Sequence, residues 1–204
     1  PPVGKTIEVM ENLSEKAARS GARIVNWNEY AFRMNKREEA AFINRACKLA
    51  LRENIYLLLP IGVFREEPGS LVENKLVFID SSGKVLWQYL KGHPVPKCEE
   101  PFVVTGDIRI PVSDTPLGKI AAVICFDLDF PAYIHQAGQA GADLLLGPSE
   151  DWAALLSTHT QAATFRAIEN GFSMVRCTYE GLTMAVDYQG RSITEVNYFR
   201  TSDN

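Results

Sequence analysis

The chain has 204 residues, of which 46% are hydrophobic, and it carries a formal net charge of −4 at pH 7. This size and composition predict one globular domain with a sizeable core. Acidic and basic residues are interspersed, so the sequence lacks a basic footprint and we expect no nucleic acid as a partner. The longest nearly unbroken apolar run, residues 55–64, contains Pro60 and is too short to span a bilayer.

Cysteine and histidine usage argues against a metal or disulfide framework. No CxxC pair is present, and the three histidines are as dispersed as the cysteines. We therefore expect no metal and no cofactor. Because no signal peptide is visible, the expected location is a reducing, cytoplasmic compartment. The four cysteines are Cys47, Cys98, Cys125 and Cys177.

Helical and strand patterns alternate in the first half of the chain. Apolar residues at helical intervals before Gly21 predict one helix, and Asn35 with Glu38 is a capping-box signature for the start of another. Apolar runs predict buried strands, and two runs joined through Ser82 and Gly83 predict a hairpin. The expected elements are a helix at 3–20, a strand at 22–27, a helix that begins after 35, a strand at 55–63 and a hairpin at 73–90.

A long loop at 91–101 with three prolines leads into the second half. The expected elements beyond it are a strand at 120–124, a helix at 131–139, a strand at 142–146, a helix at 151–170 and closing strands at 173–178, 182–187 and 192–196. This order predicts a single α/β sandwich over residues 1–204, with sheet inside and helices outside. Because the chain starts directly with a helix, we expect a further strand before Pro1.

Residues 120–131, IAAVICFDLDFP, are the stretch around which the chain is organised. The apolar run at its start suits a strand buried on both faces. Pro131 suits the first turn of a helix, because that position needs no backbone N–H. Cys125 is therefore expected at a strand-to-helix corner, where a reactive thiol is held rigidly and still meets a substrate. The alternative is a buried cysteine that only fills space.

Glu29, Lys91 and Cys125 each follow an apolar run that predicts a strand. If those strands are neighbours in one sheet, the three side chains converge at its carboxyl edge, where open α/β sheets bind ligands. Taken singly, each has an ordinary interpretation as a solvated carboxylate, a surface charge or a core residue. Their coincidence favours a functional site.

The order of Glu29, Lys91 and Cys125 resembles the carbon–nitrogen hydrolase (nitrilase) superfamily over nearly the whole chain. The segments YLKGHPVPKCEE, TPLGKIAAVICFD and FRAIENGFSMVRCTYEGLTMAVDYQGR are most similar to the catalytic domain of apolipoprotein N-acyltransferase. The resemblance implies a four-layer α-β-β-α fold. The chain departs from the family pattern at Asn28, where proline is common, at Asp127, where acyltransferases often have glutamate, and in lacking their transmembrane bundle.

The resemblance also implies a role for each residue. Glu29 acts as the general base, and Cys125 is the nucleophile that forms a thioester. Lys91 stabilises the developing oxyanion, together with the backbone N–H of Phe126. A second glutamate, Glu99, stands eight residues beyond the lysine and is expected to hold the lysine or the base in place.

Three residues are weaker candidates for contact with the substrate. Trp152 follows a predicted strand where the family places substrate-contacting residues, although core packing is an equal interpretation. His93 stands two residues from the lysine, and Tyr179 belongs to a predicted tight turn. A papain-like Cys–His pair is disfavoured, because His135 and His159 fall in predicted helices and no motif places either one.

The leading hypothesis is a thiol-dependent amidase that cleaves a non-peptide C–N bond in a small-molecule amide or acyl substrate. The alternatives are an N-acyltransferase that passes the acyl group to an amine, and a catalytically inactive binding domain. In the acyltransferase alternative, the chain is the soluble domain of a membrane-bound enzyme. Because family members often pair through helices equivalent to 131–139 and 151–170, we also expect a homo-oligomer.

Overall fold

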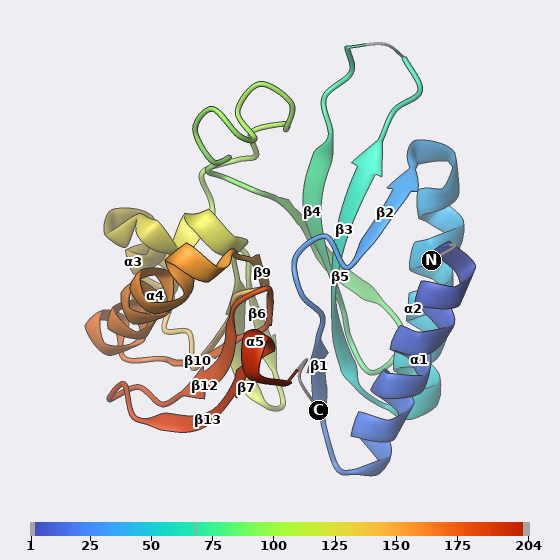
Figure 1. Cartoon of the computed structure of the whole chain (residues 1–204). Helices are drawn as coiled ribbons and strands as arrows, with labels where there is room; N and C mark the ends of the chain where they lie inside the picture. The colour runs from blue at the N-terminus through green and yellow to red at the C-terminus, as the bar shows by residue number, and fades with distance from the viewer. Residues whose placement is uncertain (1–2, 68, 202–204) are drawn as a thin grey trace.

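The computed structural model describes residues 3–67 and 69–201 (Figure 1). The first half of the chain forms α1 (Val3–Arg19), β1 (Ile24–Asn26), β2 (Phe32–Asn35), α2 (Lys36–Glu53), β3 (Tyr56–Phe64), β4 (Glu73–Ile79) and β5 (Val85–Leu90). The second half forms β6 (Val112–Thr115), β7 (Gly118–Ala122), the 3₁₀ helix η1 (Cys125–Asp129), α3 (Pro131–Gln139), β8 (Leu144–Leu146), β9 (Ser149–Glu150), the 3₁₀ turn η2 (Ala153–Leu155), α4 (Leu156–Asn170), β10 (Ser173–Arg176), β11 (Thr178–Tyr179), β12 (Leu182–Val186), β13 (Ser192–Asn197) and α5 (Tyr198–Thr201). No helix within these described ranges is both long and apolar enough to cross a membrane.

The first sheet has the order β1-β3-β4-β5, and β2 pairs with the carboxyl-terminal part of β3. β1 runs parallel to β3, whereas β4 is antiparallel to β3 and β5 is antiparallel to β4. β5 therefore runs in the same direction as β1. The carboxyl ends of these two strands consequently lie at the same edge of the sheet, although the strands are not neighbours.

The second sheet has the order β13-β12-β10-β8-β7-β6. Its centre is parallel, because β8 runs parallel to both β7 and β10. β9 and β11 follow β8 and β10 directly in the chain and pair with each other as a separate parallel two-stranded sheet. This extension carries the backbone of residues 149 and 150 beyond the end of the main sheet.

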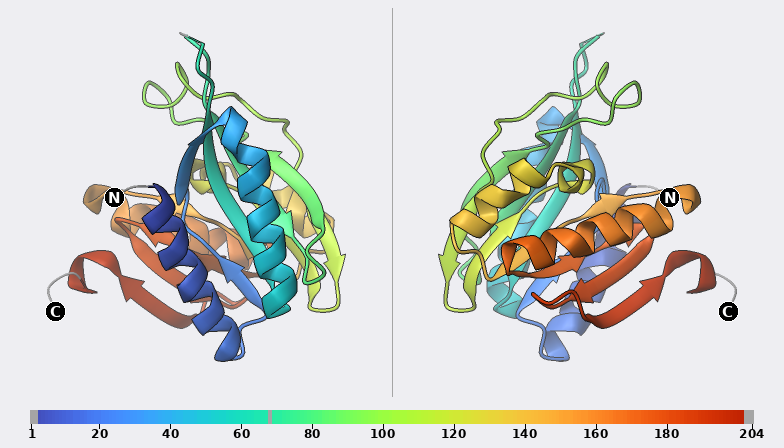
Figure 2. Two further views of the ribbon diagram at one scale, coloured as in Figure 1. Left: turned by 90° about the vertical axis from the view of Figure 1, so that its right-hand side faces the viewer. Right: turned by 90° about the vertical axis from the view of Figure 1, so that its left-hand side faces the viewer.

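The alternation of side chains along the strands builds the layers of the molecule. Leu57 and Leu59 of β3 pack in a buried cluster with α2, whereas Leu58 packs against the second sheet. Ile120 of β7 packs in the cluster between the sheets, and Ala121 packs in the cluster with α3 and α4. Figure 2 shows α1 and α2 on one outer face and α3 and α4 on the other. The predicted four-layer α-β-β-α sandwich is confirmed.

The helix predicted at 151–170 begins later than the sequence pattern suggests, at the first residue of α4. Residues 149 and 150, directly before the predicted helix, are held extended by the pairing of β9 with β11. Asp151 continues this extended segment, since its N–H donates to the carbonyl oxygen of Tyr179 at 2.9 Å. Tertiary pairing therefore overrides the local helical pattern here, and it exposes the backbone of Glu150 to the space between the sheets.

Candidate active site

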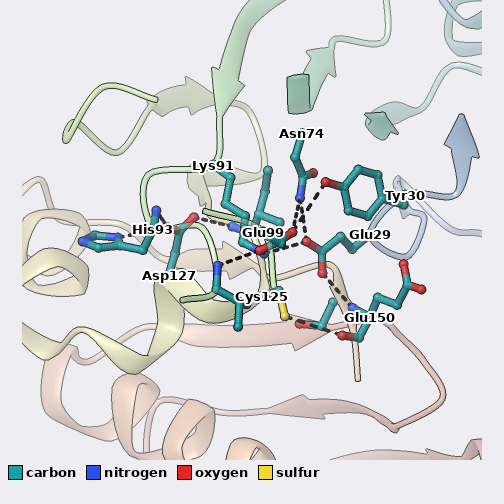
Figure 3. A network of polar contacts seen from close by, with 12 residues as sticks. Glu29, Tyr30, Asn74, Lys91, His93, Glu99, Cys125, Asp127 and Glu150 are labelled. Carbon is teal, nitrogen blue, oxygen red and sulfur yellow. Dashed lines mark hydrogen bonds and ion pairs between the residues drawn. The ribbon is translucent and has the colours of Figure 1, made fainter. Parts of the chain in front are cut away.

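A cavity of about 590 Å³ lies where Glu29, Lys91 and Cys125 meet. Glu29 follows β1, Lys91 directly follows β5, and Cys125 opens η1 after β7. The convergence was predicted on the condition that these strands are neighbours in one sheet. Two of them instead belong to the first sheet and one to the second, so the residues converge across the sandwich. Figure 3 shows the three side chains pointing toward one another.

Glu29 is only 2% exposed, and three nitrogen donors hold its carboxylate. Its Oε1 accepts hydrogen bonds from Lys91 Nζ at 2.9 Å and from Asn74 Nδ2 at 2.7 Å. Its Oε2 accepts the backbone N–H of Glu150 at 2.8 Å. Charge-assisted hydrogen bonds from three different elements replace the water that the carboxylate loses and fix its orientation.

Lys91 is 1% exposed and lies between two carboxylates. Its Nζ donates to Glu29 Oε1 at 2.9 Å and to Glu99 Oε2 at 2.6 Å. Glu99 is fixed in turn by the backbone N–H of Val95 at 2.9 Å. Burial acts to lower the pKa of Lys91, but the negative groups around it, chiefly Glu29, outweigh burial and raise the pKa above its ordinary value. Lys91 therefore supplies a permanent positive charge at neutral pH.

Cys125 is 5% exposed and has a φ of 46°, a left-handed conformation that is uncommon outside glycine. Its N–H donates to Pro148 O at 2.9 Å, and its Sγ donates to Glu150 O at 3.8 Å. Such a conformation costs about 1–3 kcal/mol and is typical of functional corners. Burial and the nearby Glu29 raise the pKa of the thiol well above its ordinary value. The resting side chain is therefore a neutral thiol that requires a base before it can attack.

Asp127 is fully buried and joins the start of η1 to the loop after β5. Its Oδ2 accepts the N–H of Ile124 at 2.9 Å and the hydroxyl of Tyr89 at 2.6 Å. Its Oδ1 accepts the backbone N–H of His93 at 2.8 Å and lies 3.1 Å from the Nδ1 of the same residue. One carboxylate therefore sets the position of the corner that carries the cysteine relative to the loop that carries the lysine (Figure 3).

The structure brings some of the weaker candidates to the cavity and not others. Phe126 and Trp152 both line it, and Trp152 is 48% exposed. Within the described part of the chain, His93 and Tyr179 are not among the lining residues. His93 is directed instead toward Asp127, and Tyr179 packs against a neighbouring tyrosine.

A buried charged cluster that the sequence pattern did not predict also lines the cavity. Ligand atoms of Asp151 and His159 lie within 4.8 Å of each other and of Cys125 Sγ. Asp151 accepts from Arg176 Nη2 at 2.8 and 2.6 Å, and both side chains are 0% exposed. His159 could not be singled out from the sequence, because a histidine in a helical pattern carries no sign of its tertiary partners. Arg176 in β10 was the available signal for a buried carboxylate, since an arginine in a buried strand requires an acidic partner.

The sequence matches the family described as Carbon-nitrogen hydrolase over residues 3–201. Because the match covers nearly the whole chain, the chain belongs to this family. The resemblance to the nitrilase superfamily, including its apolipoprotein N-acyltransferases, is thereby confirmed.

Two relatives show how the family members differ in length. Deaminated glutathione amidase of Dictyostelium discoideum is 31% identical over 71% of this chain and 53% of its own length. Apolipoprotein N-acyltransferase of Geobacter metallireducens is 28% identical over 91% of this chain and 40% of its own length. The chain therefore spans about half, or less, of the length of these two relatives.

Solved structures share the fold at lower sequence identity. An amidase from Nesterenkonia sp. superposes with a TM-score of 0.84 at 20% identity, covering 96% of this chain and 81% of that chain. A mutant of the amidase from Nesterenkonia sp. AN1, with the acetamide moiety of fluoroacetamide added covalently at its active-site cysteine, superposes with a TM-score of 0.85 at 19% identity over 97% of this chain and 81% of that chain. At this identity the likeness establishes the fold alone.

We predict that Asp127→Asn loosens the corner at Cys125. The asparagine amide keeps the shape of the side chain, but an NH₂ group replaces one of the two carboxylate oxygens. This NH₂ group then faces N–H or O–H donors that bind Asp127 in the original chain, and two donors cannot pair. The free energy of unfolding should fall by about 2–4 kcal/mol, because buried donors lose their acceptor. Urea denaturation measures this change, and iodoacetamide labelling measures the reactivity of Cys125, which should also change.

Asp114 offers a matched control, because its side chain is 85% exposed and Asp114→Asn makes the same chemical change at the surface. The control should leave both quantities within error of the original chain. Equal stability and equal labelling rates for Asp127→Asn and the control would show that the buried carboxylate does not organise the corner.

Proposed function

We propose that this chain is a thiol-dependent amidohydrolase that cleaves a non-peptide C–N bond through a thioester on Cys125. The observation that carries the proposal is the convergence of Glu29, Lys91 and Cys125 on one cavity of about 590 Å³. A carboxylate, a cation and a thiol are the groups needed to remove a proton, to stabilise an oxyanion and to attack a carbonyl carbon.

In the acylation step, Glu29 accepts the proton of the Cys125 thiol while the sulfur attacks the amide carbon. The carbonyl electron pair moves to oxygen, where the Nζ of Lys91 and the N–H of Phe126 stabilise the negative charge. Phe126 is the second residue of η1, and the first N–H groups of a helix lack acceptors within the helix. Collapse of the intermediate breaks the C–N bond, and Glu29 returns the proton to the leaving nitrogen.

In the deacylation step, water attacks the thioester carbon and Glu29 accepts a proton from that water. The C–S bond then breaks, a free carboxylic acid leaves, and the Cys125 sulfur regains its proton from Glu29. Glu99 is a positioning residue in this scheme. Its 2.6 Å contact with Lys91 Nζ holds the cation beside Glu29 throughout both steps.

The activities named for similar proteins support hydrolysis as the fate of the thioester. The Dictyostelium discoideum relative is an amidase, and so is the structural neighbour from Nesterenkonia sp.. In a mutant of the Nesterenkonia sp. AN1 amidase, the active-site cysteine carries a covalent acetamide adduct. These likenesses favour a small-molecule amide or acyl compound as the substrate of this chain.

Acyl transfer to an amine is the second candidate, because the Geobacter metallireducens relative that covers 91% of this chain is an N-acyltransferase. Both candidates share every step up to the acyl-enzyme and differ only in the group that attacks it. A binding domain without catalysis is disfavoured by the buried, hydrogen-bonded arrangement of Glu29 and Lys91 beside Cys125.

The oligomeric state stays a prediction. Phe165 and Ile168, three residues apart on α4, are 57% and 45% exposed. Exposed apolar groups of this kind are typical of contacts between protein chains. They fit the expected homo-oligomer, in which α3 and α4 of two copies pair.

We predict that Glu29→Gln slows acylation by roughly 10²-fold or more, because the amide cannot accept the thiol proton. Lys91→Met should slow it by a similar or larger factor, because the charge that stabilises the oxyanion is lost. Pre-steady-state release of the leaving group from an activated amide or ester measures this rate. Since burial raises the pKa of Cys125, acylation of Glu29→Gln should increase with pH beyond the ordinary cysteine value of 9.0.

Glu100→Gln is the matched control, because Glu100 adjoins Glu99 in the chain but is exposed. Its acylation rate should equal that of the original chain. Near-native rates in both Glu29→Gln and Lys91→Met would refute the proposed mechanism.

We predict that water, and not an added amine, resolves the acyl-enzyme. The experiment generates acyl-Cys125 with a simple ester, titrates an amine acceptor and quantifies free acid and amide product. Acid release in proportion to turnover, nearly independent of amine concentration, is the expected result. A stable thioester that only the amine discharges would replace the hydrolase with the N-acyltransferase.

A further inference from the structure

One wall of the cavity contains an acidic group that the proposed chemistry does not use. We call Asp129, Asp151 and His159 the acidic wall; all three line the same cavity as Cys125. Asp129 ends η1, Asp151 follows β9, and His159 lies on α4. A ring nitrogen of His159 lies within 4.8 Å of Cys125 Sγ. The wall therefore stands within reach of the acyl part of a bound substrate.

The contacts of His159 determine which of its ring nitrogens carries the proton of the neutral imidazole. Its Nδ1 lies 2.9 Å from Asp151 Oδ1 and 2.9 Å from Arg176 Nη2. Arginine can only donate, and Arg176 Nη2 already lies 2.8 and 2.6 Å from the two oxygens of Asp151. The Nδ1 proton therefore belongs in the hydrogen bond to Asp151, and in the neutral imidazole Nε2 is an acceptor.

This Nε2 atom is buried and has no hydrogen-bond partner in the described part of the chain. His159 as a whole is 5% exposed, so water cannot easily solvate the atom. Asp129 Oδ1 lies 3.6 Å from Nε2, beyond hydrogen-bond distance. An unpaired buried acceptor costs free energy that a donor from a bound molecule recovers.

The balance of charge identifies the kind of donor. Lys91 compensates the buried glutamates, Arg33 pairs with Glu150 at 3.1 Å, and Arg176 pairs with Asp151. Among the described residues, Asp129 and Glu180 line the cavity without an ion pair to any lysine or arginine. The cavity therefore carries an excess of negative charge, which favours a cationic ligand.

Resting on the amidohydrolase function, we propose that Asp129 and His159 form a subsite for a protonated amino group on the acyl part of the substrate, which makes small amino-acid amides the preferred substrate class. In an acyl-enzyme of such a substrate, the α-amino nitrogen stands three covalent bonds from the sulfur. One ring nitrogen of His159 lies within 4.8 Å of Cys125 Sγ, and Nε2 lies 3.6 Å from Asp129 Oδ1, so the amino group of the acyl part stands close to both partners. The ammonium group donates to Nε2 and neutralises Asp129.

A metal ion is a weaker occupant of this wall. Cys125, Asp151 and His159 are close enough to share an ion. However, Arg176 engages both oxygens of Asp151 and adds a positive charge behind them. An ammonium group at Nε2 has the imidazole ring between it and Arg176, which contacts Nδ1, whereas a metal bound through Asp151 meets this charge directly.

The test compares alaninamide with isobutyramide, which has the same shape with a methyl group in place of the amino group. Binding is measured by calorimetry on the Cys125→Ala protein at about pH 7, where an α-amino group is largely protonated. Alaninamide should bind at least about tenfold more tightly, as expected for a charge-assisted hydrogen bond. Equal affinities, tighter binding of isobutyramide, or no measurable binding of alaninamide would overturn the subsite.

Two further substitutions in the same Cys125→Ala background test whether Asp129 and His159 cause the tighter binding of alaninamide. Asp129→Asn and His159→Gln should each reduce the affinity ratio to about threefold or less, because each removes one partner of the ammonium group. Asp114→Asn is the matched control, since the Asp114 side chain is 85% exposed, and it should preserve the ratio. A ratio that survives both Asp129→Asn and His159→Gln would also overturn the subsite.

Turnover by the native chain separates this inference from the function on which it rests. Faster hydrolysis of alaninamide than of isobutyramide supports both the subsite and the amidohydrolase function. Hydrolysis of the two amides at equal rates overturns the subsite and leaves the amidohydrolase in place. Absence of hydrolysis of both amides, together with no acyl-enzyme from an activated ester, contradicts the amidohydrolase proposal alone, and the binding ratio then decides the subsite independently.

Discussion

The structure depends on a buried ion pair between Lys91 and Glu29, whose side chains are 1% and 2% exposed. Removing such charges from water costs several kcal/mol per ion, so the pair persists only if its remaining hydrogen-bonding capacity is satisfied. Glu99, Asn74 and the backbone N–H of Glu150 supply those partners. They come from the loop after β5, from β4 and from β9, so the ion pair constrains the relative position of both sheets.

The sandwich meets this requirement through strand direction. β1 and β5 end at the same edge of the first sheet, and β7 delivers Cys125 from the second sheet. The left-handed backbone at Cys125 then turns the thiol toward the carboxylate and the ammonium group (Figure 3). Buried Asp127 holds this corner against the lysine loop. The raised pKa of the thiol is consistent with a base-assisted attack, since a stable thiolate would not need Glu29 as a proton acceptor.

Much of the fold and the three central residues could be predicted from the sequence, because both follow from local patterns. Apolar runs marked the main strands, and the polar residue after each run nominated Glu29, Lys91 and Cys125. The pairing of β9 with β11 and the contact of His159 with Asp151 could not be predicted in this way, since they arise between segments that only the tertiary fold brings together. For the same reason, the sequence could not show whether the three strands share one sheet. The three side chains converge although their strands belong to two sheets.

The thiol of Cys125 is central to the proposed chemistry, because it carries the acyl group between the two half-reactions. Intact-protein mass spectrometry after rapid acid quenching of a reaction with a simple amide or ester tests this role most directly. The predicted result is a mass increase equal to one acyl group, which peptide mapping places on Cys125 and which Cys125→Ala lacks. Turnover without any adduct, or an identical adduct on the Cys125→Ala protein, for example at the exposed Cys98, would contradict this role.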